Sequence, residues 1–376
     1  LGEGGPSASA DSAEEIKDTT GVNPWRLHQG DKAPNESDLK MISFVSLKFP
    51  TVLRHFIFFC KLLPKLVGAD ILFVLDQFSA GWPAAIIGLV FKKSLILRVE
   101  GDFLWESFVE RTRQDVTLPD FYKNKPPLIL KERIIKKVTG WVLGRAFYLV
   151  FSSEWRRSMV LNNFNVPLEK TVIIQNVWPR INDQLPAVGR RKIILWAGRM
   201  LYLKNLHRLI RVFTKTNDGS YELHLVGDGS ERQNLEGLVK KEGIKNVVFF
   251  VPLGRDKLLD KFSQVSFLVL PSLSEVGPNI IADALATSTP FIMTQHTGYA
   301  EYMKDFGLLI DPLDEKDIAA KIKILMNKEI CENIEKRLAS FSLYRNWQDA
   351  AQDWIKLFYP VRTPPTPVGG NKGVSR

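Results

Sequence analysis

Short apolar runs alternate with amphipathic stretches along most of this chain, and the alternation predicts a series of β–α units. Runs such as residues 69–76 and 266–270 are continuous and apolar, which is typical of strands buried in a parallel sheet. Strands that alternate with helices favour parallel pairing through right-handed crossovers. The predicted strands are residues 41–47, 69–76, 94–102, 147–153, 171–177, 192–198, 221–227, 246–251, 266–270 and 290–294.

The periodicity breaks between residues 178 and 190, where Pro179, Pro186 and Gly189 indicate a hinge. On each side of this hinge, the series of β–α units predicts a doubly wound α/β domain. The predicted parts are a first domain at residues 1–181, a second domain at 182–345, an amphipathic helix at 346–360 and a disordered tail, rich in proline and glycine, at 361–376.

Two segments of the first domain depart from this pattern. Residues 103–127 contain three prolines and are interpreted as an active-site flap. The chain opens on a glycine-rich stretch that includes Gly4 and Gly5, and no strand precedes these glycines. We therefore expect either that the natural first strand is missing or that these residues form a disordered tail.

Composition narrows the class of protein without identifying it. The chain has 376 residues, 45% hydrophobic and 24% charged, which suits a globular protein with two domains. Its two cysteines match no zinc or disulfide pattern, so a reducing compartment is expected. No signal peptide and no apolar run long enough to span a membrane is visible, so we expect a cytoplasmic protein.

The chain is basic, with a formal net charge of +10, and this charge suits nucleic acid, anionic lipid or phosphorylated substrates alike. Much of it lies in residues 48–65 and 123–137, which belong to predicted amphipathic helices. Such helices either pack on their own domain, which is the commoner outcome, or bind the surface of an anionic membrane.

Residues 272–290 combine a loop with a helix directly after the predicted strand at 266–270. Helix formers such as Ala284 predict that the helix spans residues 279–287. Free amides at its start, between Glu275 and Asp283, suit a ligand that carries both phosphates and hydroxyls. The alternative is an ordinary strand–loop–helix unit with two solvated acids.

Two cations occupy a similar place at the start of the second series. Arg199 follows a predicted strand and Lys204 precedes a predicted helix, so their side chains suit phosphate oxygens. Gly227 and Gly229 form a further strand–Gly-x-Gly–helix unit, which is weak evidence for a nucleotide site by itself.

Together these motifs resemble the donor site of the retaining GT-B glycosyltransferases, the large family that includes sucrose and glycogen synthases and mannosyltransferases. The resemblance rests on Glu275, the Gly277–Pro278–Asn279 stretch, Asp283 and the sequence GRMLYLKN at residues 198–205. The family usually has Glu where this chain has Asp283, and a different order around Gly277. The resemblance implies two Rossmann-like domains that face each other across a cleft, and a C-terminal helix that crosses back to the first domain.

The resemblance also implies roles for these residues. Arg199 and Lys204 would bind the donor diphosphate and stabilise it as it leaves, and Glu275 would contact sugar hydroxyls and support positive charge at the anomeric carbon. Asp283 would bind the ribose hydroxyls. The other implied donor contacts are Gly4, Gly5, Gly227, Gly229, Val251, Leu253, Gly277, Pro278 and Asn279.

As the resemblance implies, the nucleotide-sugar is a substrate, no cofactor or metal is needed, and the acceptor is a glycan or a lipid-linked glycan, not a nucleic acid. No Asp-x-Asp motif follows any predicted strand, which agrees with metal-independent chemistry. The implied activity is transfer of a sugar with retention of configuration.

One position departs from the family pattern. The family commonly has His-Gly after the strand at 94–102, and this chain has Glu100-Gly101 followed by Asp102. We predict that Asp102, in preference to Glu100, is the polar group near the reacting carbon. The alternative is that Glu100 only forms a salt bridge with a neighbour such as Arg98. The missing histidine leaves two alternatives open: a catalytically weak protein that binds nucleotide-sugars, and a nucleotide-sugar epimerase.

Overall fold

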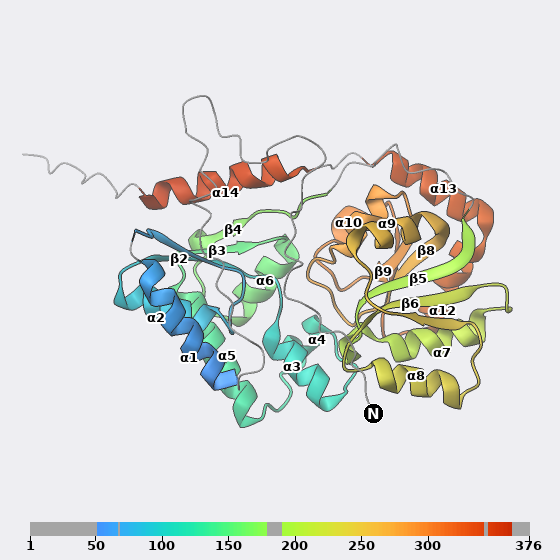
Figure 1. Cartoon of the computed structure of the whole chain (residues 1–376), viewed down its shortest axis with the longest axis horizontal. Helices are drawn as coiled ribbons and strands as arrows, with labels where there is room; N and C mark the ends of the chain where they lie inside the picture. Colours follow the sequence, from blue (N-terminus) through green and yellow to red (C-terminus); the bar gives the residue numbers. More distant parts are fainter. Residues whose placement is uncertain (1–50, 67, 179–189, 342–344, 363–376) are drawn as a thin grey trace, which may run out of the picture. The chain divides into compact units, whose positions relative to one another are not determined.

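The computed structural model describes residues 51–66, 68–178, 190–341 and 345–362, which form two parallel β-sheets flanked by helices (Figure 1). The predicted strand at 41–47, Gly4 and Gly5, the hinge at 179–189 and nearly all of the predicted disordered tail lie outside the described residues. Among the helices described, none combines the length and apolar character that a membrane-spanning segment needs.

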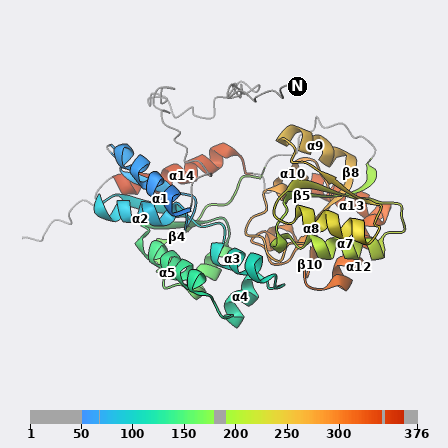
Figure 2. The ribbon, with the colours of Figure 1, turned by 60° about the horizontal axis from the view of Figure 1, so that its bottom comes forward.

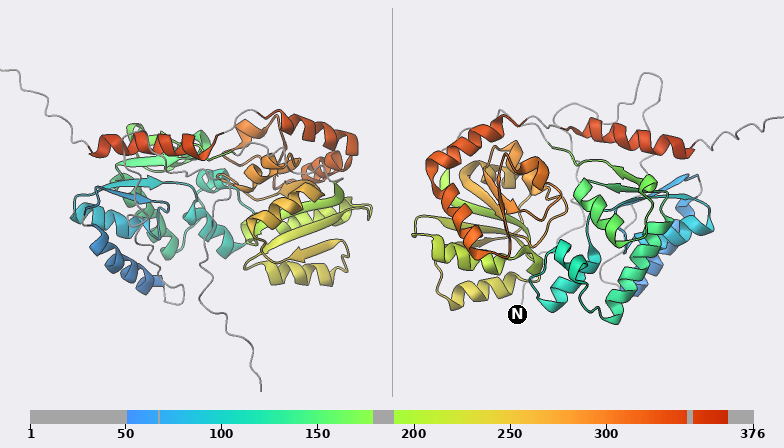
Figure 3. Two further views of the ribbon diagram at one scale, coloured as in Figure 1. Left: turned by 45° about the horizontal axis from the view of Figure 1, so that its top comes forward. Right: turned by 180° about the vertical axis from the view of Figure 1, so that it is seen from behind.

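The first sheet has the strand order β1-β2-β3-β4, and every neighbouring pair is parallel. One face is covered by α1, α2 and α5, and the opposite face by α14 (Figures 1 and 3). Because both faces of the sheet are covered, the sequences of these strands are continuous apolar runs. The strands are β1 (Ile71–Val74), β2 (Ser94–Arg98), β3 (Tyr148–Phe151) and β4 (Thr171–Ile173), and the helices are α1 (Thr51–Leu62), η1 (Leu63–Leu66), α2 (Gly81–Val90), α5 (Leu130–Arg145), α6 (Glu154–Asn163), η2 (Leu168–Lys170) and α14 (Trp347–Arg362).

The second sheet has the strand order β10-β9-β8-β5-β6-β7, again with all pairs parallel. Helices α7 and α12 lie side by side on one face, and α9 and α10 cover the other (Figures 1 and 2). The elements are β5 (Arg191–Arg199), η3 (Tyr202–Lys204), α7 (Leu206–Thr216), β6 (Glu222–Asp228), α8 (Arg232–Lys241), β7 (Val247–Phe250), α9 (Arg255–Gln264), β8 (Val265–Leu270), α10 (Ile280–Ala286), β9 (Phe291–Thr294), α11 (Ala300–Met303), β10 (Leu308–Ile310), α12 (Glu315–Met326) and α13 (Lys328–Ala339).

The order of the second sheet reverses at β5. The chain winds from β5 through β6 to β7 on one side, and then returns to β8, β9 and β10 on the other side. In open α/β sheets, ligands bind outside the carboxyl ends of the strands at such a switch point. The fold therefore predicts a ligand site where β5 and β8 end.

The predicted flap at residues 103–127 is wrong, because this segment contains two helices, α3 (Phe103–Thr112) and α4 (Leu118–Asn124) (Figure 2). Asp102 caps α3 by accepting a hydrogen bond from the Trp105 amide, and Thr117 caps α4. Pro119 lies in the first turn of α4, where a missing N–H costs little. Its prolines lie at the start of α4 and after its end, so none of them interrupts a helix.

The C-terminal helix α14 packs on the first sheet although it follows the second in sequence. The buried Leu357 contacts a cluster that includes Ile96 and Val150, and the ring of Trp354 lies 4.7 Å from that of Phe73.

The sequence pattern did not predict strand β10 at the edge of the second sheet. This strand has only three residues, so its apolar run is too short to be recognised.

Candidate functional site

The candidate site is built at the carboxyl ends of β5 and β8. Arg199 is the last residue of β5, and the loop that carries Glu275 follows β8. The backbone of this loop is fixed to the segment after β9, because the Glu275 amide donates a hydrogen bond to the His296 carbonyl. Residues far apart in sequence thus meet at the switch point of the sheet.

Lys204 is positioned by the residue that follows it. Asn205 has φ 58°, a left-handed conformation that asparagine tolerates better than most residues. Its buried side-chain amide donates to the Pro271 carbonyl (3.0 Å) and to the Pro312 carbonyl (2.8 Å). Asn205 therefore ties the turn after Lys204 to the end of β8, where the Glu275 loop begins.

Lys204 and Glu275 form an ion pair, with 2.6 Å between Nζ and Oε1. The Ser272 hydroxyl donates to the same oxygen at 2.6 Å. The other oxygen, Oε2, accepts no hydrogen bond from any residue that the structure describes. Glu275 is thus oriented through one oxygen while the second can accept a hydrogen bond from a ligand.

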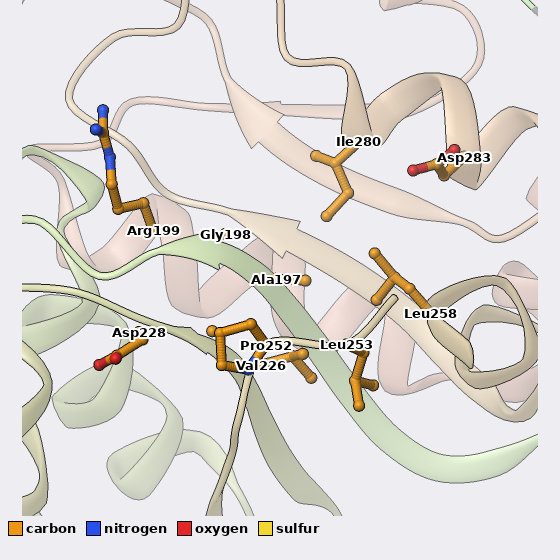
Figure 4. A pocket seen from close by; sticks show the side chains of 11 residues that line it. Ala197, Gly198, Arg199, Val226, Asp228, Pro252, Leu253, Leu258, Ile280 and Asp283 are labelled. Atoms are coloured by element: carbon orange, nitrogen blue, oxygen red, sulfur yellow. The ribbon is translucent and has the colours of Figure 1, made fainter. Parts of the chain in front are cut away.

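A cavity of about 430 Å³ lies beside Arg199 at the end of β5 (Figure 4). Arg199 stands at one side of it, Asp283 stands at the other, and apolar side chains including Pro252 and Leu253 lie between them (Figure 4). A cation for phosphates, an apolar surface for a base and a carboxylate for ribose hydroxyls are thus available in one cavity. Its lining is Ala197, Gly198, Arg199, Val226, Gly227, Asp228, Pro252, Leu253, Leu258, Ile280 and Asp283.

The charged residues of the predicted motif differ in the ion pairs that they form. Burial raises the pKa of the Asp283 carboxyl, and the Arg255 guanidinium at 3.1 Å acts in the opposite sense. The Arg199 side chain is exposed and makes no hydrogen bond or ion pair within the described part of the chain. Arg199 is therefore available to an anion, whereas Lys204 would be shared between an anion and Glu275.

Gly227 and Gly229 are required by the packing of two strand ends. A Cβ at Gly227 would lie 1.8 Å from the Gly198 carbonyl oxygen, and one at Gly229 would lie 2.3 Å from that of Met200. Both glycines also have positive φ, of 143° and 158°. They let the end of β6 approach the end of β5, and Gly227 itself lines the cavity.

A second cavity, of about 670 Å³, joins the Glu275–Asp283 segment to the first sheet. Gly277, Asn279 and Asp283 line it from one side, and Glu100 and Asn176 line it from the other. The Asn176 side-chain amide donates to the Tyr299 hydroxyl at 2.8 Å and to the side-chain oxygen Oδ1 of Asn279 at 3.5 Å. Asn176 therefore links the end of the first sheet to the predicted donor loop.

The remaining predicted contacts lie in different places. Leu253 lines the first cavity, whereas Val251 is 65% exposed and does not line it. Pro278 is buried and lines neither cavity, and its carbonyl accepts from the Ile281 amide at the start of α10. Gly4 and Gly5 lie outside the described residues.

The predicted role of Asp102 near the reacting carbon must be corrected. This carboxylate is only 3% exposed, and all of its bonding is internal. One oxygen accepts from the Trp105 amide, and the other accepts from the Tyr122 hydroxyl (2.8 Å) and from Arg156 (3.0 Å). Asp102 caps α3 and neutralises a buried arginine, so we assign it a structural role.

Glu100 pairs with Arg98, which was the alternative left open for it, with 2.7 Å between its Oε1 and the arginine Nε. Ser152 donates to the other oxygen of Glu100.

The sequence did not predict three residues near the site: Asn176, Arg255 and Glu106. Glu106 lies in the first turn of α3. An N-cap aspartate followed by Phe-Leu-Trp-Glu is the signal that could have placed Glu106 on a helix that starts near the sheet edge.

A family of known proteins matches the part of the chain that contains the candidate site. Residues 179–347 match the protein family described as Glycosyl transferases group 1. This part of the chain is therefore similar in sequence to that family. The match covers the second sheet and its helices, including Arg199, Lys204, Glu275 and Asp283.

Curated glycosyltransferases are similar to this chain over part of their length. The amylovoran biosynthesis glycosyltransferase AmsD of Erwinia amylovora is 23% identical over 58% of this chain and 61% of its own length. In Campylobacter jejuni, the GalNAc-alpha-(1->4)-GalNAc-alpha-(1->3)-diNAcBac-PP-undecaprenol alpha-1,4-N-acetyl-D-galactosaminyltransferase is 27% identical over 46% of this chain and 49% of its own length. The chain thus aligns with about half to three fifths of these relatives.

Solved structures confirm the predicted GT-B fold. The sucrose-phosphate synthase of Thermosynechococcus elongatus superposes with a TM-score of 0.66 at 18% identity, over 85% of this chain and 80% of that one. Anabaena Alr3699/HepE in complex with UDP and glucose gives a TM-score of 0.63 at 15% identity, over 80% of each chain. At these identities the likeness establishes the fold and leaves the substrates open.

Proposed function

We propose that this protein transfers a sugar from a nucleotide-sugar to a glycan or lipid-linked acceptor, with retention of configuration at the anomeric carbon. The meeting of Arg199, Lys204 and Glu275 at the switch point of the second sheet carries this proposal. The cations suit a diphosphate leaving group, and the carboxylate suits a sugar that develops positive charge. The group 1 family match supports the same class of reaction.

The adjoining cavity suits the nucleoside part of the donor. Its apolar side chains offer a surface for a base, and Asp283 at its edge offers an acceptor for ribose hydroxyls. Because Arg199 and Lys204 can offset the charge of the leaving diphosphate, we propose that no metal takes part. The likeness to Alr3699/HepE, whose structure holds UDP and glucose, makes uridine diphosphate sugars the first donors to test.

A transfer assay tests this function directly. Radiolabelled UDP-glucose, UDP-N-acetylglucosamine and GDP-mannose are incubated with the full chain and a glycan or lipid extract, in buffer that contains EDTA. We expect label to move from one donor to the extract, because no step requires a metal. Donor binding without transfer would support a binding protein, an isomerised donor would support an epimerase, and transfer that occurs only with Mn²⁺ would overturn the metal-independent mechanism.

We further propose that the protein binds the inner face of the cell membrane peripherally, which would bring a lipid-linked acceptor to the site. Helix α5 supports this, since Leu130 and Ile134 are 71% and 50% exposed. Exposed cations lie beside these apolar side chains, namely Lys131, Arg133, Lys136 and Lys137. Exposed apolar groups among lysines and arginines are typical of surfaces that bind anionic lipid.

Reversing the charge of three lysines in α5 should release the protein from anionic liposomes. Each lysine near such a surface is worth about 1 kcal/mol, so Lys131→Glu, Lys136→Glu and Lys137→Glu together should weaken binding roughly 100-fold or more. Flotation at low salt measures this. The matched control is Lys240→Glu with Lys241→Glu on α8, which carries two exposed lysines and should float normally. Absence of wild-type flotation, or equal loss in the control, rules out α5 as the binding surface.

A further inference from the structure

One face of α3 packs against the segment that carries Lys204. The Glu110 carboxylate accepts from the Leu203 amide at 3.0 Å, and Arg113, one turn further on, pairs with Glu231 at 2.5 Å. Residues four and three apart share a face of a helix, so Glu106 lies on this face, one turn closer to the helix start. Its carboxylate is thus directed toward the candidate site.

The surroundings of Glu106 agree with this placement. A Cβ added to Gly101 would lie 3.3 Å from the Glu106 Oε1 atom, so the carboxylate lies over the end of the first sheet. Within the described part of the chain, the Glu106 carboxylate makes no hydrogen bond and no ion pair, although the Glu106 backbone amide donates to the Asp102 carbonyl. It is a half-buried acid without a bonding partner, at the edge where the family commonly has a histidine.

Charged residues of the candidate site interact electrostatically with the Glu106 carboxyl. Burial raises the pKa of Glu106 above its ordinary value; Asp102 and Glu275 add to this effect, and Lys204 and Arg199 oppose it. The groups that act on Glu106 are therefore the predicted donor-binding residues, together with the buried Asp102. Asp102 is neutralised by Arg156, and Glu275 is paired with Lys204.

We propose that Glu106 contacts the transferred sugar from the α3 side, and that the site takes a sugar with free hydroxyls and no acidic group. This inference rests on the proposed function. With the diphosphate on Arg199 and Lys204, the sugar meets two carboxylates, Glu106 and Glu275. Carboxylates accept hydrogen bonds from hydroxyls, and they repel the carboxylate of a uronic acid.

Binding measurements on matched donors test the assignment. Calorimetry compares UDP with UDP-glucose and UDP-N-acetylglucosamine, and GDP with GDP-mannose, for the wild type, Glu106→Gln and Glu106→Ala. Loss of a hydrogen bond to a charged group weakens binding about 10-fold to 100-fold. We expect both variants to lose this factor for the nucleotide-sugar and to bind the nucleoside diphosphate normally. The control, Glu110→Gln, lies on the same helix face and should bind both normally.

The pH dependence of transfer gives a second readout that a purely structural role would not change. The ionised carboxylate accepts hydrogen bonds from hydroxyls, so wild-type activity should fall as the pH drops through the raised pKa of Glu106. Glu106→Gln should shift this acid limb, while Glu110→Gln should leave it in place. UDP-glucuronate should bind more weakly than UDP-glucose.

Unchanged nucleotide-sugar affinity in both Glu106 variants, or an equal loss for the nucleoside diphosphate alone, overturns the assignment. Equal binding of UDP-glucuronate and UDP-glucose overturns the exclusion of acidic sugars. A wild type that binds neither UDP nor GDP refutes the proposed function instead, so the two failures can be told apart.

Discussion

Replacing Glu275 with glutamine is expected to lower kcat about 100-fold to 1,000-fold, the usual cost of removing one group that stabilises charge in a transition state. The substitution keeps the shape of the side chain and an oxygen that can accept from Ser272. It removes the negative charge that would face an oxocarbenium-like carbon. Because that positive charge develops only in the transition state, KM for the donor should change little.

Asp283→Asn is the comparison that separates charge stabilisation from donor binding. Asp283 lies at the opposite side of the cavity from Arg199, where the ribose is proposed to bind. It should therefore act on the ground state and the transition state alike, and its loss should mainly raise KM. Steady-state kinetics on both variants measure the division of roles. A kcat for Glu275→Gln within about twofold of the wild type, or roughly 0.4 kcal/mol, contradicts the role of Glu275.

Removal of either cation should weaken binding of a nucleoside diphosphate about 10-fold to 100-fold, as for other hydrogen bonds to charged groups. Arg199→Ala removes an exposed guanidinium that has no ion-pair partner within the described residues, so the fold should be unaffected. Lys204→Ala also removes the partner of Glu275. Turnover should therefore fall further in Lys204→Ala, because Glu275 loses a group that orients it.

Calorimetry with UDP and GDP, together with turnover measurements, tests both substitutions. Lys215→Ala is the control, since Lys215 is an exposed lysine on α7 that pairs only with Glu315 among the residues described. It removes the same charge away from the strand ends and should leave affinity unchanged. Wild-type affinity in both Arg199→Ala and Lys204→Ala would show that the diphosphate binds elsewhere.

The interpretation of residues 103–127 shows where sequence patterns mislead. Proline there suggested a flap, but Pro119 lies in the first turn of α4 and the other two prolines follow its end. Burial of apolar side chains, including Trp105 and Phe108, stabilises the helices. Which side of the segment is buried depends on what packs against it, and the neighbouring residues in sequence do not reveal this.

Asp102 and Glu106 illustrate the same limit within the site. Both are acids near the end of β2, and the sequence offered no reason to prefer the second. Asp102 meets the Tyr122 hydroxyl and Arg156, which come from helices later in the chain. Glu106 meets no such partner among the described residues. Only the packing of α3 against its neighbours decides which carboxylate remains available.

The sequence by itself determined the α/β class, nearly all the described strands and the cluster of Arg199, Lys204 and Glu275. It could do so because the carboxyl ends of parallel strands gather at one edge of a sheet, so that loops far apart in sequence meet there. The tertiary structure alone decided the strand order, the ion pair between Lys204 and Glu275, and the availability of Glu106. These depend on burial and on contacts between distant segments, which hydrophobic periodicity along the chain does not encode.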